Sequence, residues 1–294
     1  MKRLVALTII FGTLMLAGCG KKVVAVVNGE KITKEELRDE AERVAGRDVL
    51  VNLIRQKIIL QAAKKEGVYP SKEEVEKEIE FRKRENPTFL EDLKKQGTSL
   101  EEYKEQLIES LAEINLVTKG IKVSDKEVEE AFNKLKPMLD RVRLRWIVNK
   151  SEDEIKKAKE KLAAGAFFET VARDSSQDTF TKDKGGDMGY VSLSQLKAIS
   201  PQLADLAISL PLGKVSDIIK LRNGYAIIRV EDRRIATLDS WRDFIRKSVM
   251  LDKANKEGKP DKVLKPLFQE AKVEIKDPRY KGLESSINLP SLPQ

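Results

Sequence analysis

The run of residues 142–233 constrains this chain more than any other feature, because strand-like and helix-like patterns alternate along it. It begins with the apolar-rich strand pattern Val142–Val148 and ends with two strand runs, Lys214–Leu221 and Tyr225–Asp232. Between them lie two helical segments, a glycine-rich loop that leads into a strand, and a helix opened by proline. The last two strands are joined through Asn223-Gly224, which predicts the positive φ angles of a tight hairpin. This β-α-α-β-α-β-β order predicts one compact α+β domain.

Four landmarks occur in order along this run. They are the strand opening at Val142, Gly165-Ala166-Phe167-Phe168, Gly185-Gly186-Asp187-Met188-Gly189 and Asn223-Gly224-Tyr225-Ala226-Ile227-Ile228. Together they resemble the landmarks of a parvulin-type peptidyl-prolyl isomerase domain. The resemblance implies that residues 141–235 form a four-stranded antiparallel sheet with flanking helices, and that this domain acts on the peptide bond before proline.

The chemistry of such a bond sets what a catalyst must supply. An amide bond before proline prefers trans only slightly, but the barrier between its isomers is roughly 18–20 kcal/mol because resonance is lost in the twisted state. A catalyst therefore needs an apolar pocket for the proline ring and polar groups that favour the twisted amide. The resemblance places the substrate-binding pocket at Met188, Leu196 and Leu203, and a plain core role for Leu203 is the equal alternative.

The polar part of the site departs from the family it resembles. Parvulin domains carry two facing histidines that flank a Cys or an Asp, and the matching positions here are Trp146, Ala226 and Asp178. The indole nitrogen only donates a hydrogen bond, and alanine has no polar side-chain atom. The resemblance therefore leaves Asp178 as the one catalytic candidate, with Trp146 lining the substrate site. A turn role for Asp178 in its Ser-, Asp- and Thr-rich loop is the alternative.

The composition excludes several other classes of protein. The chain contains no His, which rules out serine triads, histidine metal sites and histidine general bases. Its net charge of +8 is spread along helices beside many acids, so it predicts a solvated surface and no nucleic-acid partner. We expect no cofactor and no bound metal. A solute-binding lipoprotein of a transporter would need repeated β-α-β units, and the long helical stretches argue against that class.

The first eighteen residues read as a targeting segment. Lys2-Arg3 form a short basic region, and the apolar run Leu4–Leu16 is too short for a membrane-spanning helix. The run ends in Leu16-Ala17-Gly18-Cys19, which resembles a bacterial lipobox. The resemblance implies cleavage before Cys19 and lipidation of that residue, whereas the alternative is a buried or chance cysteine. We expect an exported protein, lipid-anchored on the periplasmic face of a membrane or on the outer face of a single-membrane cell.

The segment 19–122 reads as a helical module. It opens with a hairpin pattern over Val23–Ile32, and a linker helix is expected over 123–140. Capping boxes, in which a Ser or Thr is followed three residues later by Glu, predict five helix starts. They begin at Thr33, Ser71, Ser99, Ser124 and Ser151. The hairpin and the linker Val123–Val128 resemble the N-terminal chaperone region of PrsA- and SurA-type exported foldases.

The chain after the central domain predicts a return to the helical module. Residues 236–276 contain a helix over Leu238–Lys256, a second one over Asp261–Ala271 and strand alternation in Lys272–Ile275. We expect this last strand to pair with Val23–Val27. Residues 277–294, rich in proline and without periodicity, are expected to form a mobile tail. The fold class is thus α+β, with a mostly helical N- and C-terminal chaperone module and an inserted parvulin-like domain.

Two functions remain open from the sequence. The first is a membrane-anchored foldase or chaperone that binds unfolded or proline-containing exported polypeptides, with weak or lost isomerase activity. The second is an active parvulin-type peptidyl-prolyl cis-trans isomerase. The partners expected in both cases are such polypeptides and, through the lipid anchor, a membrane. The sequence leaves open whether the chain dimerises.

Overall fold

The computed structural model describes residues 22–284, and these fall into two compact units. Unit 1 is the chain up to Lys119 together with the chain from Lys259 onward, and unit 2 is Gly120–Gly258. Unit 2 is therefore inserted into unit 1, and the predicted α+β class with an inserted sheet domain is confirmed. None of the helices within 22–284 has the length and apolar character needed to cross a membrane.

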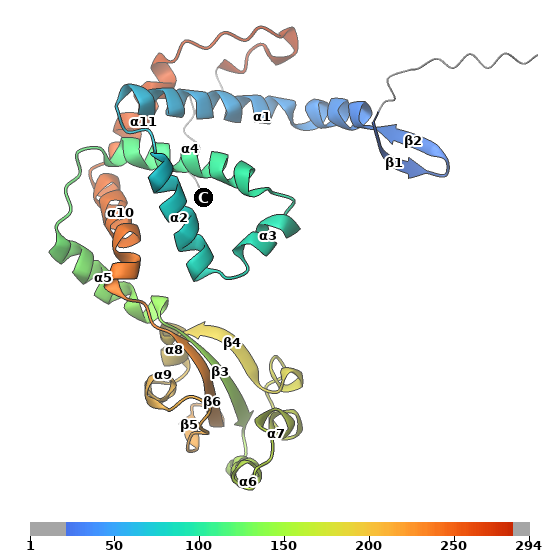
Figure 1. Ribbon diagram of the computed structural model, residues 1–294, viewed down its shortest axis with the longest axis vertical. Coiled ribbons are helices and arrows are strands. Elements are labelled where there is room, and N and C mark those ends of the chain that lie inside the picture. The colour runs from blue at the N-terminus through green and yellow to red at the C-terminus, as the bar shows by residue number, and fades with distance from the viewer. Residues whose placement is uncertain (1–21, 285–294) are drawn as a thin grey trace, which may run out of the picture. The chain divides into compact units, whose positions relative to one another are not determined.

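Unit 1 is mostly helical (Figure 1). Its elements are β1 (Val23–Val27), β2 (Glu30–Thr33), α1 (Lys34–Lys65), α2 (Lys72–Glu85), α3 (Phe89–Lys95), α4 (Leu100–Thr118), α11 (Lys259–Glu270) and the 3-10 turn η2 (Pro278–Tyr280). One core joins α1, α4 and α11 around Ile59, Leu116 and Phe268. A second core, which includes Val75 and Leu111, joins α2, α3 and α4. The C-terminal helix α11 thus completes a core begun by the N-terminal half of the chain.

All five predicted helix starts are confirmed, and each capping side chain accepts from the backbone amide three residues on. The full reciprocal box forms at Thr33, Ser99 and Ser124. At Ser71 the carboxylate of Glu74 accepts instead from the side-chain amide of Asn115, 3.2 Å away. At Ser151 the backbone N–H donates to Asn149 Oδ1 at 3.0 Å. The bond from the cap side chain to the helix therefore follows from local sequence, whereas the reciprocal bond is lost where another residue offers a competing hydrogen bond.

The predicted pairing of Lys272–Ile275 with Val23–Val27 is wrong. Strand β1 pairs with β2 in a two-stranded antiparallel sheet, and residues 272–275 form no strand. The side chains of Val273 and Ile275 are nonetheless half-buried while their neighbours are exposed, and Val273 packs on the α1–α4–α11 core. Successive side chains of an extended backbone point in opposite directions, so burial alternates along it whether the surface that covers it is a strand or a helix.

The segment 277–284, expected to belong to a mobile tail, contacts α1. Tyr280 Oη donates to Glu42 Oε1 at 2.7 Å, and Arg279 Nη2 lies 2.9 Å from the same oxygen. Leu283 is only 4% exposed. A Cβ at Gly46 would come within 2.7 Å of Tyr280 Oη, so glycine at this position of α1 gives the tail room. Residues 285–294 lie outside the described part of the chain.

Unit 2 contains the predicted sheet domain between two helices. Its elements are α5 (Asp125–Leu139), β3 (Arg141–Asn149), α6 (Glu152–Ala163), α7 (Phe168–Ser175), η1 (Lys182–Lys184), β4 (Asp187–Ser192), α8 (Leu193–Ile199), α9 (Pro201–Ser209), β5 (Ile219–Leu221), β6 (Gly224–Arg234) and α10 (Leu238–Lys256). The four strands pair antiparallel in the order β4-β3-β6-β5, so the predicted four-stranded sheet is confirmed. The predicted helix opened by proline is α9, and α8 before it is an additional helix that the predicted order lacked.

The two faces of this sheet carry different cores because side chains alternate along β3 and β6. One face, with Leu144 and Ile228, packs against Leu196 and Leu203 of α8 and α9. The opposite face, with Ile147 and Ile227, packs against α6 and α7. Figure 1 shows these helices around the sheet. Consecutive residues of β3 therefore serve opposite faces of the domain.

The hairpin between β5 and β6 differs from its prediction at one residue. Leu221 pairs with Gly224, so the loop consists of Arg222 and Asn223, and Asn223 does not adopt the predicted positive φ. Only Gly224 does, at 142°, and a Cβ there would come within 2.6 Å of the Asn149 carbonyl oxygen. The close approach of β3 thus explains why position 224 is occupied by glycine. The first strand of the hairpin is also shorter than expected, and Val215 contributes only an isolated bridge to Arg229.

Candidate functional site

Trp146 and Asp178, far apart in sequence, are joined by a hydrogen bond. The indole Nε1 donates to Asp178 Oδ2 at 2.8 Å and also contacts Thr181 Oγ1 at 3.0 Å. Thr181 Oγ1 donates to the same carboxylate oxygen at 2.5 Å, and the backbone N–H of Phe180 reaches Oδ1 at 3.3 Å. The carboxylate therefore accepts from an indole, a hydroxyl and an amide.

The loop that carries Asp178 is bound to the end of β3. The backbone N–H of Gln177 donates to the carbonyl of Val148 at 2.7 Å, and Val148 N–H donates to Ser176 Oγ at 3.2 Å. The side-chain amide of Asn149 adds a bond to the Ser175 carbonyl at 2.9 Å. Trp146 is two residues before Val148 on the strand, so these bonds bring Asp178 beside the indole.

The predicted apolar residues lie on the same face of the sheet as Trp146. Leu196, Leu203 and Ala226 are fully buried in one cluster, and Met188 and Trp146 pack against it half-buried. The structure thus brings all these positions together. Of this group, only Trp146 and Met188 have exposed surface, and the two leucines and Ala226 are buried in the core.

The turn before Met188 lies against the backbone of Trp146. Gly185 and Gly186 have φ angles of 65° and 80°, and a Cβ at Gly186 would overlap the carbonyl oxygen of Trp146. The backbone N–H of Trp146 donates to the Gly186 carbonyl at 2.9 Å. Only glycine combines this positive φ with so close an approach. The turn therefore fixes where the chain enters β4 and where Met188 lies.

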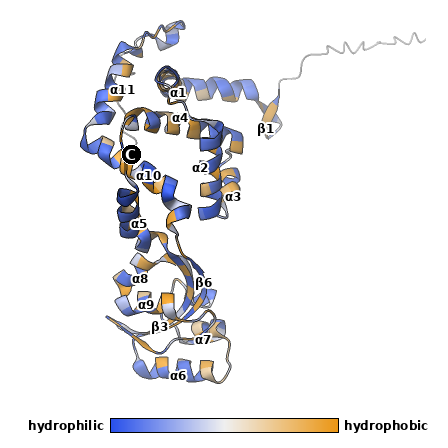
Figure 2. Ribbon diagram, turned by 60° about the vertical axis from the view of Figure 1, so that its left-hand side comes forward, coloured by the Kyte–Doolittle hydropathy of each residue, from blue (hydrophilic) through white to orange (hydrophobic). Residues whose placement is uncertain are grey.

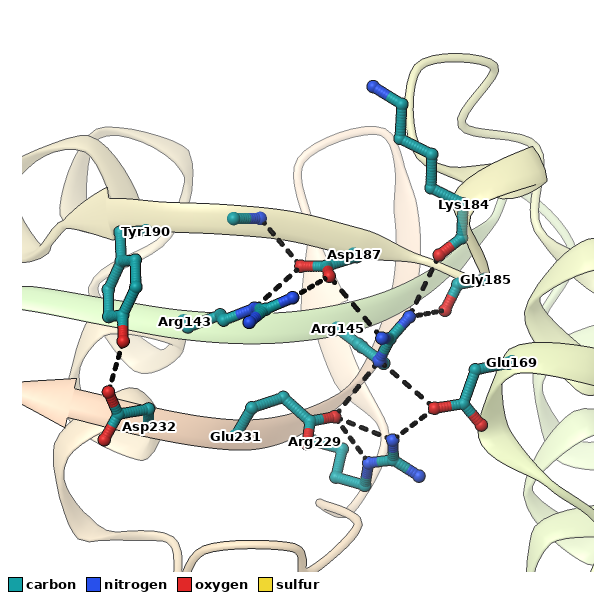
Figure 3. A network of polar contacts seen from close by, with 11 residues as sticks. Arg143, Arg145, Glu169, Lys184, Gly185, Asp187, Tyr190, Arg229, Glu231 and Asp232 are labelled. Carbon is teal, nitrogen blue, oxygen red and sulfur yellow. Dashed lines mark hydrogen bonds and ion pairs between the residues drawn. The ribbon is translucent and has the colours of Figure 1, made fainter. Parts of the chain in front are cut away.

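A charged network occupies the opposite face of β3 (Figure 3). Arg143, Arg145 and Arg229 face three acids, Asp187, Glu169 and Glu231. The Arg143 guanidinium, which donates to the Asp187 carboxylate at 2.7 Å, holds the pKa of that carboxyl below its usual value of 3.8. Charges of the two signs are equal in number here, so the network is neutral overall.

Sequence reasoning missed two residues of this region, Thr181 and Arg145. Thr181, only 8% exposed, follows Asp178 by three residues, a spacing at which a hydroxyl often meets a carboxylate in a turn. Arg145 stands in the alternating pattern Arg141, Arg143, Arg145 of β3, which marked one strand face as charged. Neither signal identified its tertiary partner. Cys19 and the leader 1–18 lie outside the described residues.

Comparison with known proteins gives consistent relatives. A family model described as "Rotamase: PPIC-type PPIASE domain" matches residues 148–232. The chain is 31% identical over 283 residues to "Foldase protein PrsA 2" of Bacillus cereus, covering 94% of each chain. It is 33% identical over 243 residues to "Foldase protein PrsA" of Clostridium botulinum strain Okra, covering 76% of this chain and 72% of the relative.

Among solved structures, the crystal structure of PrsA from Bacillus subtilis matches with a TM-score of 0.37 and 24% identity. The match covers 90% of this chain and 98% of that one.

Proposed function

The chain belongs to the family of PrsA-type foldases with a PPIC-type peptidyl-prolyl isomerase domain, and from this premise we propose that it is an exported, lipid-anchored foldase. It binds unfolded or proline-containing segments of exported polypeptides and assists their folding. Its isomerase activity is weak or lost.

The observation that carries the proposal is the hydrogen bond from Trp146 to Asp178. The three groups that donate to this carboxylate are an indole N–H, a hydroxyl and an amide N–H, and none of them titrates near neutral pH. In all three contacts the carboxylate is the hydrogen-bond acceptor. It has no titrating partner with which to polarise a twisted amide, so the site favours binding over acceleration.

Apolar surface in both units supports polypeptide binding. In unit 2, Trp146 and Met188 present a half-buried apolar surface beside Asp178. In unit 1, valines of β1 are between 41% and 59% exposed, and Figure 2 shows hydrophobic colouring on that strand. Side chains of α1 such as Val44 and Leu53 are also at least half exposed. Exposed apolar groups of this kind mark surfaces that bind other polypeptides.

One observation favours the second candidate, an active isomerase. The Asp178 carboxylate lies next to the apolar group where the resemblance expects an acid, and the family model, which matches residues 148–232, includes Asp178. A precisely placed negative charge beside a bound proline can by itself stabilise a twisted amide.

A refolding assay with the full chain separates the two functions. The substrate is an unfolded protein whose refolding is limited by a proline bond, and both the slow phase and the aggregated fraction are measured. We expect suppressed aggregation with little acceleration of the slow phase. The variant M188A should weaken suppression, whereas M138A, at an exposed methionine of α5, should not. Strong acceleration that disappears in D178A would instead establish the isomerase.

The anchor rests on the lipobox-like ending Leu16-Ala17-Gly18-Cys19. We expect the wild-type protein in the membrane fraction of a bacterial host and C19A in the unprocessed fraction. Because unprocessed C19A keeps the apolar run Leu4–Leu16 and stays with the membrane, the deciding readouts are cleavage and acyl labelling, and equal cleavage and labelling of both forms would overturn lipidation at Cys19. Dimerisation is tested separately by sedimentation of the full chain.

A further inference from the structure

All three backbone N–H groups of the turn formed by Lys184, Gly185 and Gly186 donate to the carbonyls of Thr181 and Lys182. Gly185 N–H donates to Lys182 and Gly186 N–H to Thr181, both through backbone carbonyls. The carbonyls of Lys184 and Gly185 point away from these bonds and toward β3, as Figure 3 shows. Two adjacent glycines give a chain with high conformational freedom when unfolded. The Trp146 N–H holds the carbonyl of Gly186, so the carbonyls of Lys184 and Gly185 are the two that require a further donor from outside the turn.

Arg145 provides this external support. Its Nη1 donates to the Lys184 carbonyl at 2.9 Å and to the Gly185 carbonyl at 3.1 Å. Its Nη2 lies 3.5 Å from Asp187 Oδ2, on the other side of Gly186. One guanidinium thus spans the turn, with its two ends on the residues before and after Gly186.

Asp187 extends this support to Met188. Its Oδ1 accepts from the backbone N–H of Gly189 at 2.9 Å, and its Oδ2 accepts from Arg143 Nη2 at 2.7 Å. The main chain on both sides of Met188 is therefore fixed by one carboxylate. Asp187 is also the cross-strand partner of Arg145 in the β3–β4 register.

The Arg145 side chain is itself held in place. Only 17% of it is exposed, and its Nε lies 3.2 Å from both Glu169 Oε1 and Glu231 Oε1. Arg229 pairs with the same two acids, and these ion pairs do not involve the turn. A lysine at position 145 would keep the charge, but a single ammonium lacks the planar fork that reaches two carbonyls and a carboxylate together.

We propose that Arg145 is the positioning residue of the proline-binding site. From one face of β3 it fixes the turn 184–187, and through that turn it sets the place of Met188 beside Trp146 on the other face. This inference rests on the proposed function for its consequence, since Met188 must contact the substrate. The placement of Met188 can nonetheless be measured without any substrate.

The test compares R145K with the matched control R229K in the full chain. Both changes replace an arginine of the same network by lysine, but only Arg145 contacts the turn. The first readout is the carbon-13 methyl signal of Met188, assigned by its loss in M188L. The second is the affinity for a synthetic peptide with one central proline.

We expect R145K to shift or broaden the Met188 signal and to weaken peptide binding roughly tenfold, as the loss of the two carbonyl bonds implies. R229K should leave both readouts unchanged even if it lowers the melting temperature equally. An unmoved Met188 signal in R145K, or equal shifts in both variants, overturns the inference. A wild-type chain that binds no proline peptide instead overturns the proposed function, and the methyl signal still decides the role of Arg145.

Discussion

Trp146 Nε1 and Asp178 Oδ2 are 2.8 Å apart, so the position at which a parvulin-like site would carry histidine holds a group that only donates. The Trp146–Asp178 hydrogen bond takes the place of a contact between the acid and an imidazole, which would titrate. It retains the geometry that brings the acid to the sheet, and it removes the proton exchange that an imidazole would provide. The Trp146 side of the site therefore has no group that titrates near neutral pH.

The first prediction is that W146H raises isomerase activity. An imidazole at this position lies within reach of Asp178 and restores a group that titrates near pH 6.5. We expect the proline-limited refolding rate to increase several-fold over wild type and to depend on pH around that value. The control W146F removes the donor without adding an imidazole and should give no increase. A pH-independent rate in W146H equal to that of wild type would contradict the prediction.

The second prediction concerns Thr181, whose hydroxyl donates to Asp178. The variant T181V keeps the shape of a side chain that is only 8% exposed, but it leaves the carboxylate one donor short. We expect a loss of about 1–2 kcal/mol in the free energy of unfolding, measured by urea denaturation. The same change at the exposed Thr179 is the control and should cost less than about 0.5 kcal/mol. Equal losses in the two variants would show that the hydroxyl of Thr181 contributes nothing specific.

How much of this site the sequence could predict depends on how local each signal is. Helix starts such as Ser99 follow from neighbours along the chain and were predicted correctly, as was the four-stranded antiparallel sheet that the resemblance implied. The landmarks also led to Trp146 and Asp178, because family spacing carries information about tertiary contacts that composition does not. The partner of Val273 was missed, since an extended segment alternates in the same way on a helix as on a strand.

The role of Arg145 was beyond the sequence for a different reason. Its partners are the carbonyls of Lys184 and Gly185, and a backbone carbonyl leaves no mark on the side-chain pattern. The prediction of a positive φ at Asn223 failed because Asn223 and Gly224 were assigned to the two central positions of the turn. Gly224 is instead the first residue of β6, where β3 comes close, and it alone of the two has a positive φ. Both misses concern backbone geometry set by a neighbouring strand.

The third prediction is that G186A is far more damaging than G213A. Both glycines have positive φ, 80° and 75°, so both variants carry a backbone cost of about 1–2 kcal/mol. A Cβ at position 213 meets nothing within 4 Å, whereas at 186 it overlaps the Trp146 carbonyl. We expect a total loss of about 3–5 kcal/mol in unfolding free energy for G186A, by adding the cost of overpacking. Thermal unfolding of the two variants checks this, and losses within about 1 kcal/mol of each other would mean that β3 moves to accommodate the methyl group.

The fourth prediction is an acid-specific loss of stability through Asp187. The hydrogen bond from Arg143 holds the pKa of this carboxyl below its usual value of 3.8, helped by the Gly189 amide and by the charge of Arg145. Because the pKa is lower in the folded than in the unfolded protein, the stabilising contribution is fully present above pH 3.8 and is lost as pH falls through the folded value.

The measurement is urea unfolding of wild type and D187N from neutral pH into this acid range. The difference in unfolding free energy should be constant near neutral pH and should shrink below pH 3.8, because wild-type Asp187 then becomes protonated and loses its ion pairs. The exposed Asp183, three residues before Gly186, supplies the control D183N, for which the difference should stay near zero at every pH. A D187N difference near zero across the whole range would mean that Asp187 acts through its bond to Gly189 N–H alone, since an asparagine oxygen keeps that bond at any pH.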